Sequence, residues 1–472
     1  MNSRKINLIT HAIFVLSCLF LAGKSHAQVP FVVVDSINIG GNVHTKDYII
    51  YNELDFAPGD TIYFDKIQKV FRDNKYRVLG TGLFVNAVFN LKKYNSATSR
   101  GNVDIQLNEA WYIYPVFGIE LTDRNFNEWI TEHNASLKRI NFAAGIKHMN
   151  VSGNNDAGQI KIQGGTTKKF ELDYKRPFFG SHYRGGFDLN IMYKFSKELA
   201  YNTINNKLVY VKNDEHNLFK QFRSKISFHW RPGIFNTHTV TLQYNNIRVA
   251  DSILTHYNPD FISGNPVQQS LDISYSLVHD KRQFQMYPEG GHYINFLIEK
   301  TGTGIFGDVD ILNACLEVQK YFSFNKKYIT AVKSKVKKNV YAKDIPYFNN
   351  RSLGYEEDYL NGYELYVIDG EDYFYSKFSQ KIKLWSSVID MQKILSLEQF
   401  RVIPMDIYFS LNFDTGYVNN NVNFAKNNFT NRWLYSYGAG LDINVYHNYF
   451  QLYVSFNHLK EAGVFFHYRN KL

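Results

Sequence analysis

The feature that most constrains the fold is a period-two alternation of apolar and polar residues, which recurs from about residue 111 to the C-terminus. Between residues 187 and 195, large apolar side chains fall on every second position: Phe187, Leu189, Ile191, Tyr193 and Phe195. Successive side chains of a β-strand point to opposite faces, so each such segment separates an apolar face from a polar one. The chain is therefore predicted to be mainly β.

Roughly 16 strands can be counted, and bacterial membrane barrels have an even number. They lie near residues 111–120, 138–149, 157–165, 168–177, 183–196, 218–231, 236–249, 267–280, 291–300, 309–321, 327–340, 372–387, 402–413, 432–444, 448–457 and 462–469. Connections after even-numbered strands are mostly short, and those after odd-numbered strands are mostly long. Membrane barrels segregate short turns and long loops in this way. We predict an antiparallel transmembrane β-barrel over residues 111–472, with a soluble sandwich or propeller as the minor alternative.

Composition agrees with a barrel rather than with a bundle of membrane helices. The mean hydropathy is −0.33, and aromatic residues make up 17% of the chain. Barrels place aromatic residues in two interfacial girdles, while every second strand residue faces a wet lumen. The net charge of +10 is spread along the whole chain. A basic lumen or attraction to anionic lipid explains that charge as well as nucleic acid would, so no nucleic-acid partner is expected.

The N-terminus has the features of an export signal. Arg4 and Lys5 precede an apolar segment, residues 13–21, that is too short to span a bilayer. Residues 25–27 then offer a cleavage site after Ala27. We predict a signal peptide over residues 1–27, with lipidation of Cys18 as the minor alternative. Cys315 would then be the one remaining thiol, which excludes an internal disulfide and a cysteine-based zinc site.

Residues 30–110 are predicted to form a small α/β domain, with the order strand, helix, helix, strand, strand. The elements are expected over residues 31–39, 46–54, 65–79, 84–91 and 103–107. This order resembles a POTRA domain, and the resemblance rests on Ile37, Ile39, Gly41, Asn42, Thr45, Pro58, Gly59, Asp60, Gly82, Leu83, Phe84 and Glu109. Another small α/β fold is the alternative. A POTRA sheet leaves an edge open, with which an extended client peptide can pair.

The predicted sixth long loop carries the most informative motif. Leu360, Gly362 and Tyr363 resemble a stretch of the BamA/TamA family of outer-membrane assembly factors, in which this loop folds back into the lumen. Asn361 stands at the position of the family's arginine. An arginine there would bind a carboxylate of the barrel wall through two hydrogen bonds. The lock is therefore expected to be weaker or rearranged, with Arg351 as a candidate replacement.

Two further stretches resemble the same family. The first is a periplasmic turn between the eighth and ninth strands, with the motif residues Asp280, Arg282, Pro288 and Gly290. The second is the closing pair of strands. The barrel is expected to close between its first and last strands, through a seam that includes Val116, Gly118, Gly463, Phe466 and Tyr468. The last strand is short and contains Gly463, so only a few weak hydrogen bonds are expected there.

The sequence contains no catalytic constellation. It lacks a Gly-x-Ser-x-Gly stretch and a His-Glu-x-x-His stretch. Six acidic residues flank the sixth loop: Glu356, Glu357, Asp358, Asp369, Glu371 and Asp372. A solvated loop is favoured here over a divalent-cation site. We therefore expect neither enzyme activity, nor a metal, nor a cofactor.

The resemblance implies a short, single-POTRA member of the BamA/TamA type in the outer membrane of a Gram-negative bacterium, with its N-terminal domain in the periplasm. It would insert β-barrel proteins by pairing client strands at the seam. The alternative is a pore that translocates one dedicated polypeptide. The implied partners are outer-membrane lipids and unfolded β-barrel clients, and could include periplasmic chaperones or accessory lipoproteins.

Overall fold

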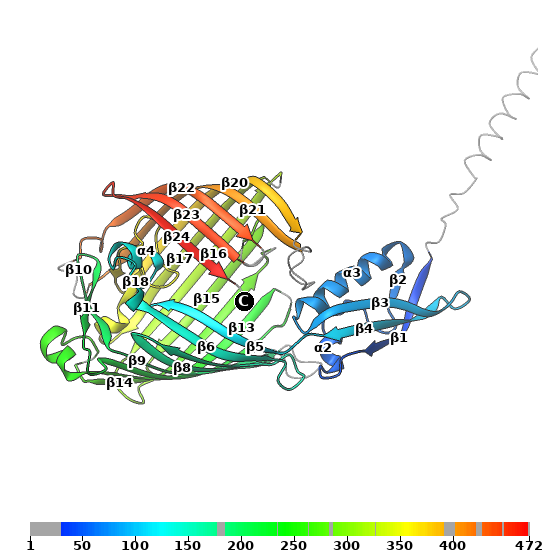
Figure 1. Cartoon of the computed structure of the whole chain (residues 1–472), viewed down its shortest axis with the longest axis horizontal. Coiled ribbons are helices and arrows are strands. Elements are labelled where there is room, and N and C mark those ends of the chain that lie inside the picture. The colour runs from blue at the N-terminus through cyan, green and yellow to red at the C-terminus, as the bar shows by residue number, and fades with distance from the viewer. Residues whose placement is uncertain are drawn as a thin grey trace, which may run out of the picture. The chain divides into compact units, whose positions relative to one another are not determined.

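The structure is a computed structural model that describes residues 30–176, 185–233, 235–262, 264–282, 287–325, 327–390, 402–421, 427–445 and 448–470. The predicted signal peptide, residues 1–27, lies outside the described residues. Contacts divide the chain into two compact units (Figure 1). The first comprises residues 1–43 and 50–110, and the second comprises residues 44–49 and 111–472.

The N-terminal part of the chain has the predicted α/β order plus one additional strand. Its elements are β1 (Phe31–Gly40), α2 (Asp47–Tyr51), β2 (Thr61–Tyr63), α3 (Phe64–Gly80), β3 (Phe84–Asn95) and β4 (Arg100–Glu109). The sheet order is β2-β1-β4-β3, with β1 and β4 parallel. One side of α3 is buried through Asn74 and Val78. β2 was not predicted because three residues are too few to show a period, and the helix expected over residues 46–54 is shorter.

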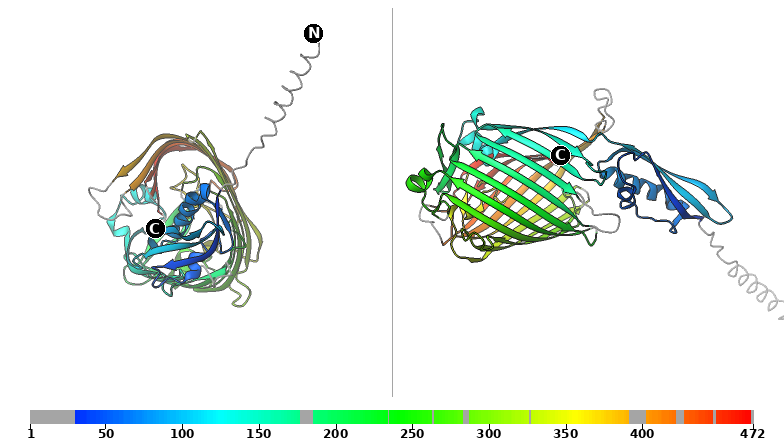
Figure 2. Two further views of the ribbon diagram at one scale, coloured as in Figure 1. Left: turned by 90° about the vertical axis from the view of Figure 1, so that its right-hand side faces the viewer. Right: turned by 90° about the horizontal axis from the view of Figure 1, so that it is seen from below.

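The second unit is a barrel of sixteen strands, in which every neighbouring pair is antiparallel (Figure 2). The strands are β5 (Ile113–Leu121), β6 (Ile140–Met149), β7 (Ala157–Gly164), β8 (Thr167–Arg176), β9 (Gly185–Ser196), β12 (Phe219–Trp230), β13 (Asn236–Val249), β14 (Val267–Asp280), β15 (Gly291–Thr301), β16 (Ile311–Phe324), β17 (Tyr328–Ala342), β20 (Asp372–Asp390), β21 (Val402–Asn419), β22 (Trp433–Val445), β23 (Asn448–Asn457) and β24 (Ala462–Asn470). The predicted sixteen-stranded antiparallel barrel is confirmed.

The barrel exposes apolar side chains on its outer surface and buries polar ones inside, the reverse of the usual distribution in a soluble protein. Exposed apolar side chains on the strands include Phe142, Ile146, Ile160, Phe170, Leu172, Phe228, Val240, Leu242, Ile273, Phe296, Leu316, Phe378, Leu411, Leu452 and Val454. Buried polar side chains include Asn141, Gln163, Asn190, Ser227, Asp272, Gln319, Ser410, Asn412, Asp414, Ser436 and Asp442. This distribution suits strands that face hydrocarbon outside and a polar lumen inside. The helices in the described part of the chain are all too short or too polar to cross a membrane.

The long connections leave the barrel at one end, here called the loop end, and the opposite end is the turn end. The loop-end connections contain α4 (Phe126–Thr131), the hairpin β10 (Glu198–Ile204) and β11 (Lys207–Lys212), and the short pair β18 (Arg351–Leu353) and β19 (Ile368–Asp369). They also contain the short helices η1 (Leu137–Arg139), η2 (Ile253–Tyr257) and η3 (Tyr347–Asn349). Neither α4 nor the β10–β11 hairpin was predicted, and both cover segments that were expected to be irregular loops.

Candidate functional site at the seam and the lumen loop

Residues 343–371, here called the lumen loop, pack against the inner wall of the barrel through the Leu360–Tyr363 motif. Leu360 is 1% exposed and Tyr363 is 2% exposed. Both belong to a buried cluster that also contains Leu353, Ile368, Tyr373, Tyr375, Val418, Phe429 and Leu434. Tyr363 Oη donates a hydrogen bond to the carbonyl of Tyr435 at 3.1 Å. The motif therefore forms an apolar anchor with a polar end.

Gly362 is required by the backbone at this anchor. Its φ is +80°, which side chains other than glycine rarely adopt. A Cβ at this position would also lie 3.3 Å from the carbonyl carbon of Phe456 on β23. The loop backbone can approach the wall closely only because this residue has no side chain.

The position of the family's arginine is organised differently in this chain. The backbone N–H of Asn361 donates to Oδ2 of Asp414 on β21 at 2.8 Å. Nζ of Lys377 on β20 lies 3.7 Å from the same oxygen, and it donates to Oδ1 of Asn361 at 3.5 Å. The wall carboxylate thus has a cation from the neighbouring strand, and the loop contributes only neutral groups.

A guanidinium does hold the lumen loop, but it comes from the first long connection. Arg124 donates to the carbonyls of Gly354, Glu364 and Tyr366. Arg351, the candidate replacement, instead lies over the rings of Phe348 and Tyr355, with its carbon Cζ 4.7 and 5.2 Å from the ring centres. Sequence reasoning missed Arg124 because nothing in the local sequence marks its contacts, which are made more than two hundred residues away.

His458 lies in the loop-end turn after β23 and stacks on the anchor tyrosine. Its Nδ1 is 2.6 Å from Oη of Tyr363, and its backbone N–H donates to the same oxygen at 3.3 Å. Burial lowers the pKa of His458 below its ordinary value, and the nearby Arg432 charge acts in the same direction. The lowered pKa favours the neutral imidazole, whose Nδ1–H can donate to the phenol oxygen while that phenol donates to the Tyr435 carbonyl.

The acidic residues around the lumen loop do not converge on a cation site. Asp358 pairs with Lys335 at 2.6 Å and also accepts hydrogen bonds from Tyr373 and Tyr375. The other ion pairs are separate, with Glu357 on Arg469 and Asp372 on Lys338. Asp358 is therefore paired with the barrel wall, whereas the side chain of Glu357 is 69% exposed and faces solvent, as expected for a solvated loop.

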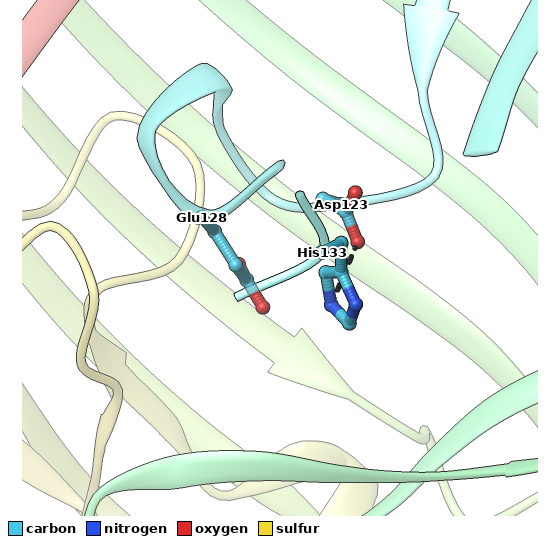
Figure 3. A group of neighbouring side chains, drawn as sticks. All are labelled: Asp123, Glu128 and His133. Atoms are coloured by element: carbon cyan, nitrogen blue, oxygen red, sulfur yellow. Dashed lines mark ion pairs between the residues drawn. The ribbon is translucent and has the colours of Figure 1, made fainter. Parts of the chain in front are cut away.

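One cluster in the described part of the chain has metal-ligand geometry: Asp123, Glu128 and His133 in the first long connection (Figure 3). Arg139 contacts Asp123 at 2.6 Å, and Arg124 contacts Glu128 at 2.9 Å. Burial disfavours the charge of Arg139, but hydrogen bonds to Asp123 and Glu198 outweigh it and raise the pKa of this guanidinium. Because arginines already neutralise both carboxylates, the cluster is an ion-pair network that needs no metal.

The predicted turn motif lies at the turn end of β14 and β15. Arg282 pairs with Asp280 at 2.8 Å and lies over the ring of Tyr293. Pro288 lines a cavity of about 180 Å³ inside the barrel, and Gly290 directly precedes β15. These residues therefore belong to the turn that the sequence predicted.

Tyr287 of this turn reaches into the lumen, which the sequence did not predict. It is 4% exposed, and its ring centre lies 4.6 Å from that of Tyr408 and 5.0 Å from that of Tyr449. Glu289 pairs with Lys383 on β20 at 2.8 Å. The turn is thus attached to strands on another part of the wall.

The seam differs from its expected form. The sheet order begins at β24 and ends at β5, and no backbone ladder joins these two strands among the described residues. We expected a ring closed by a few hydrogen bonds between them. Instead, Asn127 of α4 exchanges two hydrogen bonds with the backbone of Phe466 on β24, at 2.9 and 3.4 Å.

The remaining predicted seam residues lie on the two edge strands. Val116 and Gly118 are on β5, whose alternate residue Phe117 is 80% exposed. Tyr468 is exposed on β24, and the ring of Phe465 covers Gly463. A cavity of about 710 Å³ lies between the edges, and its lining includes Ile119, Phe126, Phe450, Phe466 and Arg469. The structure brings these residues together around α4 rather than across a ladder.

Sixteen antiparallel strands with an apolar exterior, a loop folded into the lumen and a small α/β domain define an outer-membrane barrel protein with a POTRA domain. A family model for the Omp85 superfamily domain matches residues 100–446. A POTRA model, described as the surface antigen variable number repeat, matches residues 32–110. The chain belongs to the Omp85 superfamily, whose proteins work in insertion or secretion at the outer membrane.

Solved structures resemble the chain over nearly its whole length. BamA from Haemophilus ducreyi lacking POTRA domains 1–3 is 15% identical, with a TM-score of 0.59, and the match covers 93% of this chain and 84% of that one. CdiB from Acinetobacter baumannii is 10% identical, with a TM-score of 0.51, and the match covers 93% and 73%. No curated protein matches the sequence. At these identities the likeness concerns the fold alone.

Proposed function

We propose that this protein inserts β-strands of client proteins into the outer membrane at the seam between β5 and β24. The observation that carries the proposal is the absence of a ladder between these two strands in the described part of the sheet. Each unpaired backbone group costs several kcal/mol in hydrocarbon. A client strand that pairs with either edge would satisfy its own groups and those of the edge.

Strand length supports the seam as the place of insertion. β5 and β24 each have 9 residues, and the strands on either side of the seam, β6, β7, β8 and β23, have 8 to 10, whereas β20 and β21 have 19 and 18. A tilted strand needs about 9–11 residues to span the bilayer. The seam strands are at the lower limit of that range, so the membrane beside them would become thinner, which lowers the barrier to insertion.

In this proposal the turn end and the N-terminal domain lie in the periplasm. β3 is one of the two edge strands of the N-terminal sheet and, among the described residues, pairs with β4 alone, so its other edge is available to an extended peptide. Unfolded β-barrel proteins would be the clients, and outer-membrane lipids would surround both the barrel and the inserted client strands. Periplasmic chaperones or accessory lipoproteins could deliver the clients.

The alternative is a pore for one dedicated polypeptide. The contacts inside the barrel favour insertion over this alternative. The lumen loop is anchored on the wall from the loop end through Tyr363, and Tyr287 enters the lumen from the turn end. A polypeptide passing through the lumen would have to displace both, whereas insertion at the seam would leave both in place.

The test uses the full chain in liposomes with a denatured outer-membrane barrel as the client. Folded barrels resist SDS until heated, so client folding can be followed as a shift in gel migration. We expect faster client folding than in empty liposomes or in liposomes with an unrelated barrel, and equal rates would refute insertion. Depleting the protein in cells separates the alternatives, because broad loss of barrels supports insertion and loss of one exported protein supports a dedicated pore.

A further inference from the structure

The side chain of Asn127 occupies the free edge of the last strand (Figure 1 labels α4 and β24). Its Oδ1 accepts from the N–H of Phe466 at 2.9 Å, and its Nδ2 donates to the carbonyl of Phe466 at 3.4 Å. Asn127 is 4% exposed. The neighbouring Phe126 places its ring edge-on to the ring of Phe466 at 5.2 Å.

These two hydrogen bonds reproduce the pairing of one strand residue with another. In an antiparallel ladder, two opposite residues exchange both N–H···O bonds. A carboxamide carries the same donor and acceptor as a peptide group. Phe466 lies opposite Leu452 in the ladder with β23, and its bonds to Asn127 show that its N–H and carbonyl point to the other side. Since the pattern repeats every second residue, Val464 and Tyr468 present their backbone groups to the same edge.

We propose, on the basis of the insertion function above, that Asn127 is an internal substitute for a client residue and that α4 must leave before a strand can pair with β24. A strand entering the seam needs the backbone groups of Phe466 for its own ladder. This contact between α4 and β24, here called the latch, consists of the two hydrogen bonds of Asn127 and the ring contact of Phe126 with Phe466. A strand that forms several consecutive pairs with β24 can therefore displace it.

The latch is held in place by the lumen loop. Asn125 caps α4 by accepting from the N–H of Glu128 at 2.8 Å, and its Nδ2 donates to the carbonyl of Glu364 at 2.8 Å. Arg124 adds the hydrogen bonds to the carbonyls of the same loop. A helix of six residues is unstable by itself, so the position of α4 depends on these contacts. The lumen loop and the seam are thereby coupled through one short segment.

The latch can be tested on the full chain in phosphatidylethanolamine–phosphatidylglycerol liposomes, by hydrogen–deuterium exchange of the peptide spanning residues 462–470. We expect Asn127→Ala to speed exchange of the Phe466 edge amide roughly tenfold, because this amide loses its hydrogen-bond acceptor. Asn127→Asp keeps the acceptor for Phe466 but loses the donor, so its effect should be smaller. Ile130→Ala is the control, because Ile130 is on the same helix and 44% exposed.

Unchanged exchange in Asn127→Ala, or an equal increase in Ile130→Ala, would overturn the latch. If Asn127→Ala does not fold, as judged by gel migration with and without heating, Asn127→Asp provides the same test.

Adding a denatured barrel client then separates the latch proposal from the insertion proposal. Faster client folding with Asn127→Ala supports both. If the edge amides respond but no client folds with either protein, the insertion function fails and the latch stands. If clients fold and Asn127→Ala changes neither measurement, the latch fails alone.

Discussion

Lys377 and Asp414 are direct cross-strand partners on β20 and β21, and Nζ of the lysine lies 3.7 Å from Oδ2 of the aspartate. The side chain of Asp414 is fully buried, and that of Lys377 is 16% exposed. The N–H of Asn361 adds a hydrogen bond to the same carboxylate. The wall of this barrel therefore carries its own cation, which is consistent with an asparagine at the position where the family resemblance implies an arginine.

Lys377→Met should destabilise the barrel by about 3–5 kcal/mol, because it leaves the buried Asp414 carboxylate without a cation. The measurement is the temperature at which the protein loses its folded migration on SDS gels. Lys338→Met is a matched control, since Lys338 pairs with Asp372 but is 66% exposed. An exposed pair contributes at most about 1 kcal/mol. Equal shifts for the two variants would contradict the importance of the buried pair.

Asn361→Arg should rescue Lys377→Met. In the rescued protein the guanidinium would come from the loop and bind Asp414 through two hydrogen bonds. In the wild-type background the same substitution should destabilise the fold, because two cations would then share one buried carboxylate. The four proteins form a double-mutant cycle measured by the same melting assay. Additive effects would show that the two positions do not exchange the cation.

Arg124→Gln should free the lumen loop, since it removes a charged donor from the carbonyls of Gly354, Glu364 and Tyr366. Hydrogen bonds to charged groups are worth about 1.5–3 kcal/mol. We expect protease cleavage within residues 343–371 at a protease concentration that leaves the wild type intact. Arg351→Gln is the comparison, because Arg351 contacts rings and not this backbone. Cleavage in Arg351→Gln but not in Arg124→Gln would show that Arg351, and not Arg124, holds the lumen loop.

Loop docking should weaken in acid. The pKa of His458 is below its ordinary value of about 6.5 in the folded protein. The undocked state therefore binds a proton more readily, and the stability that the neutral imidazole provides is complete above that ordinary pKa and is lost as the pH falls below it. We expect a lower melting temperature at pH 5 than at pH 7.5, and a smaller difference in His458→Gln. An unchanged difference in His458→Gln would assign the effect to other groups.

The strands could be predicted because lipid outside and a polar lumen inside impose alternation at nearly every position. The β10–β11 hairpin was missed although it carries a local signal. Asn205 and Asn206 both have positive φ and form the two-residue turn, and an Asn-Asn pair between alternating residues favours such a turn. Asn206 is then buried against Val367, Asn427 and Phe429.

No comparable local signal marks Asn127, which binds the edge of β24, or Arg124, which binds the carbonyls of the lumen loop. Arg124 and Asn127 lie in a segment that was interpreted as a plain loop, and their partners are Gly354, Tyr366 and Phe466. Such contacts depend on where the curved sheet brings its two edge strands, which follows from the number of strands and their register. Period-two patterns specify which face a residue occupies but not which distant segment it meets.

The lumen is obstructed at both ends, so ions crossing the barrel should have to pass two obstructions one after the other. Tyr287 and Glu289 enter from the turn end, and the lumen loop enters from the loop end. Removing one obstruction leaves the other to limit the current, so Tyr287→Ala and Arg124→Gln should each raise the conductance in planar bilayers only slightly. The double variant should raise it by more than the sum of the two. Phe228→Ala is the control, since Phe228 is an exposed, outward-facing residue on β12.

The single variants decide between the two proposed functions. If the lumen is a translocation path, it must open readily, and Tyr287→Ala alone should then give large, stable channels. If clients instead enter at the seam, both obstructions are permanent parts of the wall, and large channels should require the loss of both. Wild-type protein that already conducts steadily would favour the pore, because a lumen with Tyr287 packed between Tyr408 and Tyr449 should pass little current.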